Sequence, residues 1–257
     1  MKTPTVFGHR GASGDYPENT LLSFRNALKA GAHAIESDIR LTRDGIPVLF
    51  HDKNLKRTTG IDKKIDEIPF ESLRTIDCGA MFTKDGGKSF PFRGRGIRVP
   101  ALDEFLAEFP DTHINLEIKD GTVEAIKAAL DVLKKRRALD RALIASFSTA
   151  PVFYVRENYP VVATSATKGE VLDFLFSIHL KKRPPSVIKY DALQIPPTYY
   201  KIKILDNTLI FFAKNAGVTV HAWTINSRET AERLLSMGVD GIMSDYPKMV
   251  LDVLKEL

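Results

Sequence analysis

Residues 5–39 read TVFGHRGASGDYPENTLLSFRNALKAGAHAIESDI, and this stretch decides the fold class. Two short runs typical of strands, at residues 5–8 and 34–39, flank a segment at residues 21–30 whose apolar side chains recur with helical spacing. Gly31 follows that segment, at the place where a glycine commonly ends a helix in the left-handed conformation. The stretch therefore predicts a strand, a helix and a second strand, which is the repeating unit of a parallel sheet.

The same alternation continues along the chain. Eight strand candidates can be counted, at residues 5–8, 34–39, 113–118, 142–147, 161–165, 192–195, 219–223 and 241–244. Helical candidates follow most of them, at residues 21–30, 123–135, 150–158, 171–180, 207–215, 228–237 and 248–257. Eight strand–helix units in 257 residues predict an α/β fold of the TIM (β/α)8 barrel type.

One long segment departs from this alternation. We interpret residues 53–100 as an insertion after the second strand unit, within a single domain that spans residues 1–257. An apolar run at residues 46–50 precedes the insertion, and we expect it to pair with the second strand across the turn at Asp44 and Gly45. Loops of this length are uncommon in compact domains and are often functional, so we expect the insertion to help cover the active site.

Composition excludes several classes of protein. Hydrophobic residues make up 44% of the chain and charged residues 27%, which is typical of a globular protein with a sizeable core. Cys78 is the only cysteine, so the chain forms no intramolecular disulfide and no cysteine metal site, and a reducing compartment such as the cytoplasm is favoured. No segment offers the ~20 apolar residues that a membrane span requires, so we expect no stable membrane insertion.

The basic residues are scattered along the chain. The net charge of +5 is compatible with an anionic substrate, but no basic stripe with interleaved aromatic residues indicates nucleic-acid binding. Clusters at residues 134–137 and 181–183 lie at the ends of helical segments, where cations interact favourably with the helix dipole. We therefore give these clusters a structural interpretation.

Carboxylates gather at the predicted strand ends, where a barrel of this type carries its chemistry. Glu36 and Asp38 stand two residues apart, so they point to the same face of the second strand, and Glu117 and Lys119 do the same on the third. Three carboxylates at one mouth would repel one another unless a cation lay among them, and Mg²⁺ and Ca²⁺ prefer such oxygen ligands. Arg10 and Lys119 add fixed positive charge that suits a phosphate group.

Two histidines complete this set of groups. His9 closes the first strand, and His51 follows the apolar run at residues 46–50. Histidine exchanges protons near neutral pH, so one could accept a proton from a nucleophile while the other protonates a leaving alkoxide. Together the residue types indicate metal-assisted phosphodiester cleavage. The other histidines are interpreted as structural. This interpretation is weakest for His221, which lies two residues before Trp223 on the seventh predicted strand.

These residues match the pattern of a known family over nearly the whole chain. The order and spacing of several motifs resemble the glycerophosphodiester phosphodiesterase family: Gly8-His9-Arg10-Gly11, Pro17-Glu18-Asn19-Thr20, Glu36-Ser37-Asp38, His51-Asp52, Glu117-Ile118-Lys119, Trp223-Thr224 and Ser244-Asp245-Tyr246-Pro247. Where relatives commonly have Pro-Thr-Leu, this chain has Pro100-Ala101-Leu102, a difference that touches none of the proposed groups.

The resemblance implies a TIM barrel that hydrolyses glycerophosphodiesters to glycerol 3-phosphate and an alcohol, with one bound divalent cation, Mg²⁺ or Ca²⁺. It also implies roles for individual residues: Glu36, Asp38 and Glu117 as metal ligands, His9 and His51 as general acid and base, and Arg10, Lys119 and Trp223 as contacts to the phosphate and glycerol parts of a small-molecule substrate. Trp223 has barrel packing as its plain alternative, and Asn19 or Thr20 has an alternative as the N-cap of the first helix. Gly11 is expected to allow close approach of the ligand.

Two other functions stay open at this stage. A lysophospholipase D-like phosphodiesterase on the same barrel would cleave lipid headgroups, and a catalytically silent relative would only bind phosphate. An exposed apolar rim would favour the first, whereas the presence of both histidines and all three carboxylates argues against the second. Which histidine is acid or base, the alcohol that leaves and the oligomeric state are not determined by the sequence.

Overall fold

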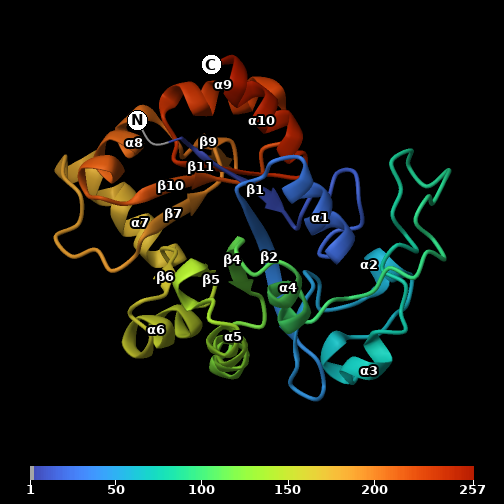
Figure 1. Ribbon diagram of the computed structural model, residues 1–257. Coiled ribbons are helices and arrows are strands. Elements are labelled where there is room, and N and C mark those ends of the chain that lie inside the picture. The colour runs from blue at the N-terminus through green and yellow to red at the C-terminus, as the bar shows by residue number, and fades with distance from the viewer. Residues whose placement is uncertain (1–2) are drawn as a thin grey trace.

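A computed structural model describes residues 3–257 and has the expected barrel (Figure 1). Its eight parallel strands within these residues are β1 (Thr5–His9), β2 (Ala34–Leu41), β4 (His113–Ile118), β5 (Ala142–Ala145), β6 (Ala163–Thr164), β7 (Ala192–Ile195), β10 (Thr219–Ala222) and β11 (Gly241–Ser244). They neighbour one another in the order β6-β5-β4-β2-β1-β11-β10-β7. A parallel bridge between Ser165 and Ala192 brings the two end strands together, so the sheet is a nearly closed barrel. The prediction of a TIM barrel is confirmed.

Helices surround this sheet (Figure 1). The principal ones are α1 (Leu21–Lys29), α4 (Leu102–Glu108), α5 (Val123–Lys135), α6 (Thr149–Asn158), α7 (Lys168–Phe176), α8 (Asn207–Asn215), α9 (Arg228–Met237) and α10 (Pro247–Glu256). Local signals set their ends: the Thr20 hydroxyl accepts from the Ser23 amide at the start of α1, and Gly238 ends α9 with a positive φ. A five-residue π-helix, η3 (Ser177–Lys181), continues α7.

Alternation along the strands separates the apolar core from the polar centre. Ile35 and Ile39 of β2 belong to the same apolar cluster as Phe24 of α1, so they face the helices. Glu36 and Asp38 alternate with them and therefore point into the barrel, where both are buried. The geometry that buries the apolar face of β2 thus places two carboxylates at the centre.

The segment between β2 and α4 contains its own short elements. Strand β3 (Pro47–Leu49) pairs antiparallel with β2, as the apolar run predicted. Short helices α2 (Lys56–Thr59) and α3 (Phe70–Leu73) and the 3-10 turn η1 (Ile65–Glu67) follow, and they lie to one side of the barrel (Figure 1). They pack around a small apolar cluster of their own, consisting of Val48, Phe50, Leu55, Ile65, Ile68, Leu73, Cys78 and Val99.

A second departure from the alternation follows β7. Strands β8 (Thr198–Tyr199) and β9 (Ile202–Lys203) form a two-residue-loop hairpin that the sequence did not predict. Over residues 3–257, none of the helices combines the length and the apolar character needed to cross a membrane.

Candidate active site

Three carboxylates converge at the carboxyl ends of β2 and β4. Asp38 of β2 lies beside Glu117 of β4 in the parallel register. Glu36 stands two residues before Asp38, on the same face of β2. One ligand oxygen from each residue lies within 4.8 Å of the other two. The Oε1 atom of Glu117 is buried and has no hydrogen-bond partner within residues 3–257. A hard divalent cation fits this arrangement, because it would satisfy the orphaned oxygen and offset the mutual repulsion.

Two cationic side chains border these carboxylates. The Arg10 Nε lies 3.2 Å from one oxygen of Asp38, and the Lys119 Nζ lies 3.2 Å from the other and 2.8 Å from Glu117. Burial alone would raise the pKa of Asp38, but Arg10 and Lys119 hold it below its ordinary value. Burial and the charge of Asp38 instead raise the pKa of Glu36 to about 7. Asp38 is therefore ionised at neutral pH, whereas Glu36 gains and loses its proton near neutrality.

His9 is held by a carboxylate from the opposite end of the chain. Its Nδ1 lies 2.6 Å from Asp245, whose oxygens also accept from the Ser13 hydroxyl and the Asn226 amide. This contact leaves Nε2 directed to the site, 3.8 Å from Glu36. Burial opposes a charge on the His9 ring, but Glu36 and Asp245 outweigh this effect and raise its pKa. His9 is therefore poised to hold a proton.

His51 has a matching arrangement with a different balance of charge. Its Nδ1 lies 2.6 Å from Asp52, which also accepts from the Arg57 Nε at 2.6 Å. Burial lowers the pKa of His51, Asp38 raises it, and the nearby Arg10 lowers it again, so the pKa falls below its ordinary value. The two histidines thus have pKa values displaced in opposite directions.

Glu18 connects the phosphate-contact candidate Arg10 to the insertion. It accepts from the Arg10 Nη1 at 3.0 Å and from both terminal nitrogens of Arg57 at 2.7 Å. With Asp52, these residues form a continuous chain from Arg10 to His51. The sequence assigns no individual role to Glu18 or Arg57, because neither stands at a predicted strand end and the contact between them spans 39 residues.

The segment before α1 serves the site as well as the helix. Thr20 caps α1 as predicted, while Asn19 takes a positive φ of 54° and donates to Asp38 at 2.9 Å. The Ser37 hydroxyl donates to the same Asn19 side chain at 2.6 Å and so fixes its orientation. A strained backbone position at such a place is typical of functional sites.

Gly11 has a packing role that the sequence did not indicate. It has a φ of 88°, and a Cβ at this position would collide with the side chain and backbone of Ser23. The glycine is required by the close packing of its loop on α1, and its close approach to a ligand stays a prediction.

Trp223 and His221 follow one another on the β10 side of the barrel but differ in setting. The Trp223 ring lies 6.5 Å from that of Phe147, and Phe147 in turn lies 5.9 Å from the Lys119 Nζ, so Trp223 borders the same mouth. Its contact with substrate stays a prediction. His221 is buried against Phe7, and burial lowers its pKa to about 4, which supports its structural interpretation.

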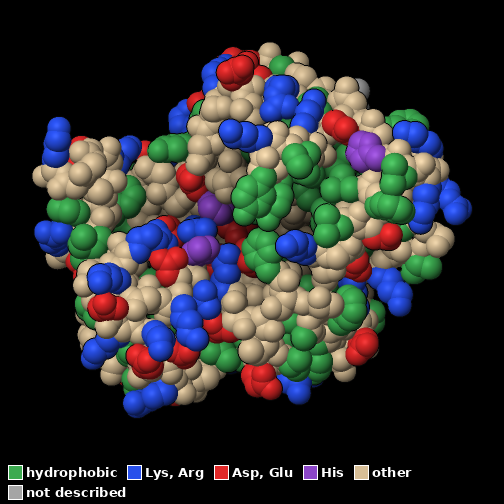
Figure 2. All heavy atoms as spheres, turned by 180° about the vertical axis from the view of Figure 1, so that it is seen from behind, with side chains coloured by type: hydrophobic (Ala, Val, Ile, Leu, Met, Phe, Trp, Pro, Cys, Tyr) green, Lys and Arg blue, Asp and Glu red, His purple; other side chains and the backbone are tan. Residues whose placement is uncertain are grey.

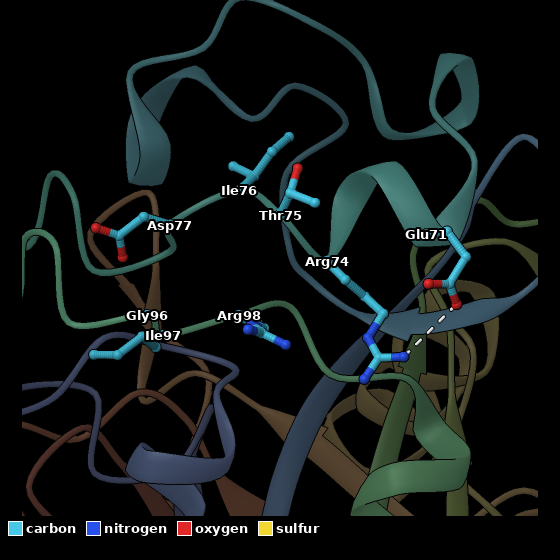
Figure 3. A pocket seen from close by; sticks show the side chains of 8 residues that line it. All are labelled: Glu71, Arg74, Thr75, Ile76, Asp77, Gly96, Ile97 and Arg98. Atoms are coloured by element: carbon cyan, nitrogen blue, oxygen red, sulfur yellow. Dashed lines mark ion pairs between the residues drawn. The ribbon is translucent and has the colours of Figure 1, made fainter.

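The carboxyl face of the barrel is hollowed where these groups meet. Figure 2 shows histidine, acidic and basic side chains around one hollow near the middle of this face. A separate hollow of about 520 Å³ lies in the insertion, lined in part by Glu71, Arg74, Asp77 and Arg98, and contains none of the predicted site residues (Figure 3). Arg74 there pairs with Glu71 at 3.6 Å and with Glu104 at 3.3 Å.

Comparison with known proteins places this geometry among relatives. Residues 9–249 match the model of the glycerophosphoryl diester phosphodiesterase family. A glycerophosphodiester phosphodiesterase from Caldanaerobacter subterraneus subsp. tengcongensis is 30% identical over 100% of this chain and 99% of its own, and one from Bacillus altitudinis is 28% identical over 98% of each. A solved phosphodiesterase from Oleispira antarctica, in complex with its product sn-glycerol-3-phosphate, is 29% identical with a TM-score of 0.79, covering 98% of this chain and 97% of its own.

Proposed function

Because the chain belongs to the glycerophosphoryl diester phosphodiesterase family, and is thus a phosphoric diester hydrolase, we propose that it releases glycerol 3-phosphate and an alcohol by two-histidine acid–base catalysis at a site for one divalent cation. The convergence of Glu36, Asp38 and Glu117 within 4.8 Å, beside two histidines that are each held by a carboxylate, carries this proposal. The substrate is a small-molecule glycerophosphodiester.

The histidines divide the proton transfers. His51, with its lowered pKa, accepts the proton of the attacking nucleophile, and His9, with its raised pKa, gives a proton to the leaving alkoxide oxygen. Asp52 and Asp245 hold the Nδ1 atoms, so Nε2 is the reacting nitrogen in both rings. Phosphorus gains one oxygen and loses the alcohol oxygen, and the two protons move in opposite directions.

The cation and the fixed charges stabilise the phosphoryl oxygens. Glu36, Asp38 and Glu117 would hold Mg²⁺ or Ca²⁺, which supplies Lewis-acid stabilisation of developing negative charge. Arg10 and Lys119 lie on either side of Asp38 and present the donors that a phosphate requires. Trp223 would form a wall for the glycerol part. We propose that residues 53–100 are an insertion in a single domain, which contributes Arg57 to this site.

Release of glycerol 3-phosphate from glycerophosphocholine tests the proposal. We expect His9→Ala and His51→Ala each to lower kcat by roughly 10²- to 10⁴-fold while the circular dichroism of the fold is kept. His113→Ala is the matched control, because His113 is exposed at the amino end of β4 and should leave turnover unchanged. EDTA should abolish turnover and Mg²⁺ or Ca²⁺ restore it. Full activity in EDTA would defeat the cation, and normal turnover in either site variant would remove that histidine from the pair.

A lysophospholipid is the second candidate substrate, because one side of the mouth is apolar. Phe147 is 68% exposed beside Trp223. A higher kcat/KM for lysophosphatidylcholine than for glycerophosphocholine would favour this second substrate, whereas the reverse ratio would support the proposed one. We also propose a cytoplasmic location, because the single cysteine, Cys78, is buried and free, as is usual in a reducing compartment.

A further inference from the structure

One continuous surface combines exposed apolar side chains with unpaired cations, and the proposed reaction uses none of it. It consists of the β8–β9 hairpin and residues 177–189, and we call it the hairpin surface. Its apolar members are exposed by half or more: Leu180, Val187, Tyr199, Tyr200 and Ile202. His179 of η3 lies 4.0 Å from Asp206, three residues beyond the hairpin, which connects the two segments in space. Solvent exposure of so many large apolar groups in one region indicates an interaction site.

Lysines and arginines are the prevailing charged residues of this surface. Residues 177–190 and 198–205 contain no aspartate or glutamate but six lysines and arginines. These six are all exposed: Lys181, Lys182, Arg183, Lys189, Lys201 and Lys203. None of them forms an ion pair within residues 3–257, although most lysines and arginines around the catalytic site do. The helix-dipole explanation that the sequence suggested for residues 181–183 does not account for Lys201 and Lys203, which lie in a hairpin.

The hairpin part of this surface adjoins the face through which substrate enters. The hairpin follows the carboxyl end of β7, and the catalytic groups lie at the carboxyl ends of β1, β2 and β4 in the same barrel. Figure 2 shows green side chains continuing from the central hollow across this face, with basic side chains around them. A flat partner that covered the hairpin surface would therefore lie next to the catalytic mouth.

We propose that the hairpin surface docks the enzyme onto an anionic lipid membrane. Interfacial binding elements combine apolar and aromatic side chains, which enter the boundary between headgroups and acyl chains, with lysines and arginines that meet anionic headgroups. Tyr199 and Tyr200 suit this boundary, because their rings are apolar and their hydroxyls stay hydrated. Charge complementarity favours a lipid surface over a protein partner, since six lysines and arginines that form no ion pair within residues 3–257 match a surface of uniform negative charge.

Co-sedimentation of the full chain with vesicles tests this proposal. We expect binding to vesicles of phosphatidylcholine mixed with phosphatidylglycerol, weak binding to phosphatidylcholine alone, and release by salt. Lys201→Gln combined with Lys203→Gln should reduce the partition coefficient roughly 20-fold, from about fivefold per cation at an anionic surface. Lys29→Gln combined with Lys134→Gln is the matched control: it removes the same charge from the last turns of α1 and α5, at the opposite end of the barrel, and should have a much smaller effect.

An apolar pair of variants provides an independent measurement. Ile202→Ser should weaken binding, whereas Val161→Ser should not, although the two side chains are exposed to a similar degree, 66% and 63%. All four variants should hydrolyse glycerophosphocholine in solution at the wild-type rate, so a failure of docking is distinct from a failure of the proposed reaction. Equal affinity for neutral and anionic vesicles, equal losses in a variant and its control, or an absence of vesicle binding would overturn the proposal. So would a wild-type dimer that Ile202→Ser converts to a monomer while vesicle binding is absent, because the surface would then join two copies of the chain.

Discussion

Glu36→Gln should make the cation-free protein relatively more stable as the pH rises. In the folded chain, burial and Asp38 raise the pKa of Glu36 from 4.5 to about 7. A group with a raised folded pKa contributes stability that is fully present below its unfolded pKa and is lost as the pH rises through its folded pKa. Wild type in EDTA therefore loses this contribution between about pH 4.5 and pH 7, while the neutral glutamine loses nothing.

The size of the effect follows from the pKa displacement. A shift from 4.5 to about 7 corresponds to a free energy on the order of 3 kcal/mol, since each pH unit is worth about 1.4 kcal/mol. About 2 to 3 kcal/mol of this falls between pH 5 and pH 8. Several histidines also titrate in this window, with displacements of both signs, so the quantity to compare is the difference between variant and wild type. The contributions of His51 and His221 largely cancel in that difference, whereas His9 titrates together with Glu36 and is part of the effect measured.

Urea unfolding in EDTA, followed by circular dichroism at pH 5 and pH 8, measures this difference. The variant's advantage in free energy of unfolding should grow by about 2 to 3 kcal/mol between the two pH values. Glu229→Gln, at an exposed position in the first turn of α9, should give a profile parallel to that of wild type. Excess Mg²⁺ should remove most of the wild-type loss, because the cation takes the place of the proton on Glu36. Parallel profiles of Glu36→Gln and wild type in EDTA would refute the reasoning, since Glu36 would then ionise as an ordinary surface glutamate does.

Three further predictions concern the two proposed catalytic histidines and the groups that hold them. Asp245→Asn should lower kcat by roughly 10²-fold with little change in KM, because the amide no longer fixes the His9 tautomer. Steady-state kinetics measures both constants, and a rise in KM as large as the fall in kcat would contradict the prediction. In Arg57→Lys the lysine cannot bridge Glu18 and Asp52 together, so kcat should fall about tenfold or more while the midpoint of urea unfolding hardly changes. An unchanged kcat with a lowered midpoint would instead make Arg57 a structural residue. The profile of kcat/KM against pH should be bell-shaped, rising below pH 6.5 as His51 loses its proton and falling above pH 6.5 as His9 does; a profile with a single limb would remove one of the two assignments.

Helix bounds were predictable where a capping side chain agrees with the apolar period. The predicted helices at residues 123–135, 207–215 and 228–237 match α5, α8 and α9, whose first turns are capped by Thr122, Asp206 and Ser227. The helix expected from residue 171 begins instead at Lys168, because a capping box between Thr167 and Glu170 starts it before the apolar residues do. Apolar spacing alone therefore places the start of this helix three residues late.

Short elements held by tertiary contacts were not predictable in the same way. Helix α4 has seven residues, and the β8–β9 hairpin pairs only two residues on each side. Neither is long enough for a periodic pattern to emerge from a single sequence. The hairpin is exposed along both strands, so it also lacks the alternation of buried and exposed residues that marks a strand.

Within the site, contacts between residues close in the sequence were predictable, and contacts between residues far apart in the sequence were not. Glu36 and Asp38 could be placed together because a spacing of two along a strand fixes one face. The partnership of His9 with Asp245 spans 236 residues, and no local pattern indicates it. The closure of the barrel places β1 beside β11, and only that closure brings the two residues together.

Arg57 shows why the insertion matters to a site that the barrel otherwise builds. Arg57 is about half exposed, and ion pairs at such positions contribute little to stability, so its contacts with Glu18 and Asp52 are poorly explained as a device for holding the fold together. Their geometry has a different consequence. One planar guanidinium fixes the carboxylate that binds Arg10 and the carboxylate that binds His51, and thereby sets the separation of a phosphate donor from a proton-transfer group. Such separations govern rate far more steeply than they govern stability, because reaction depends on alignment within fractions of an ångström. Arg57 thus gives the proposed insertion a role in aligning these groups, in addition to the cover that the sequence predicts.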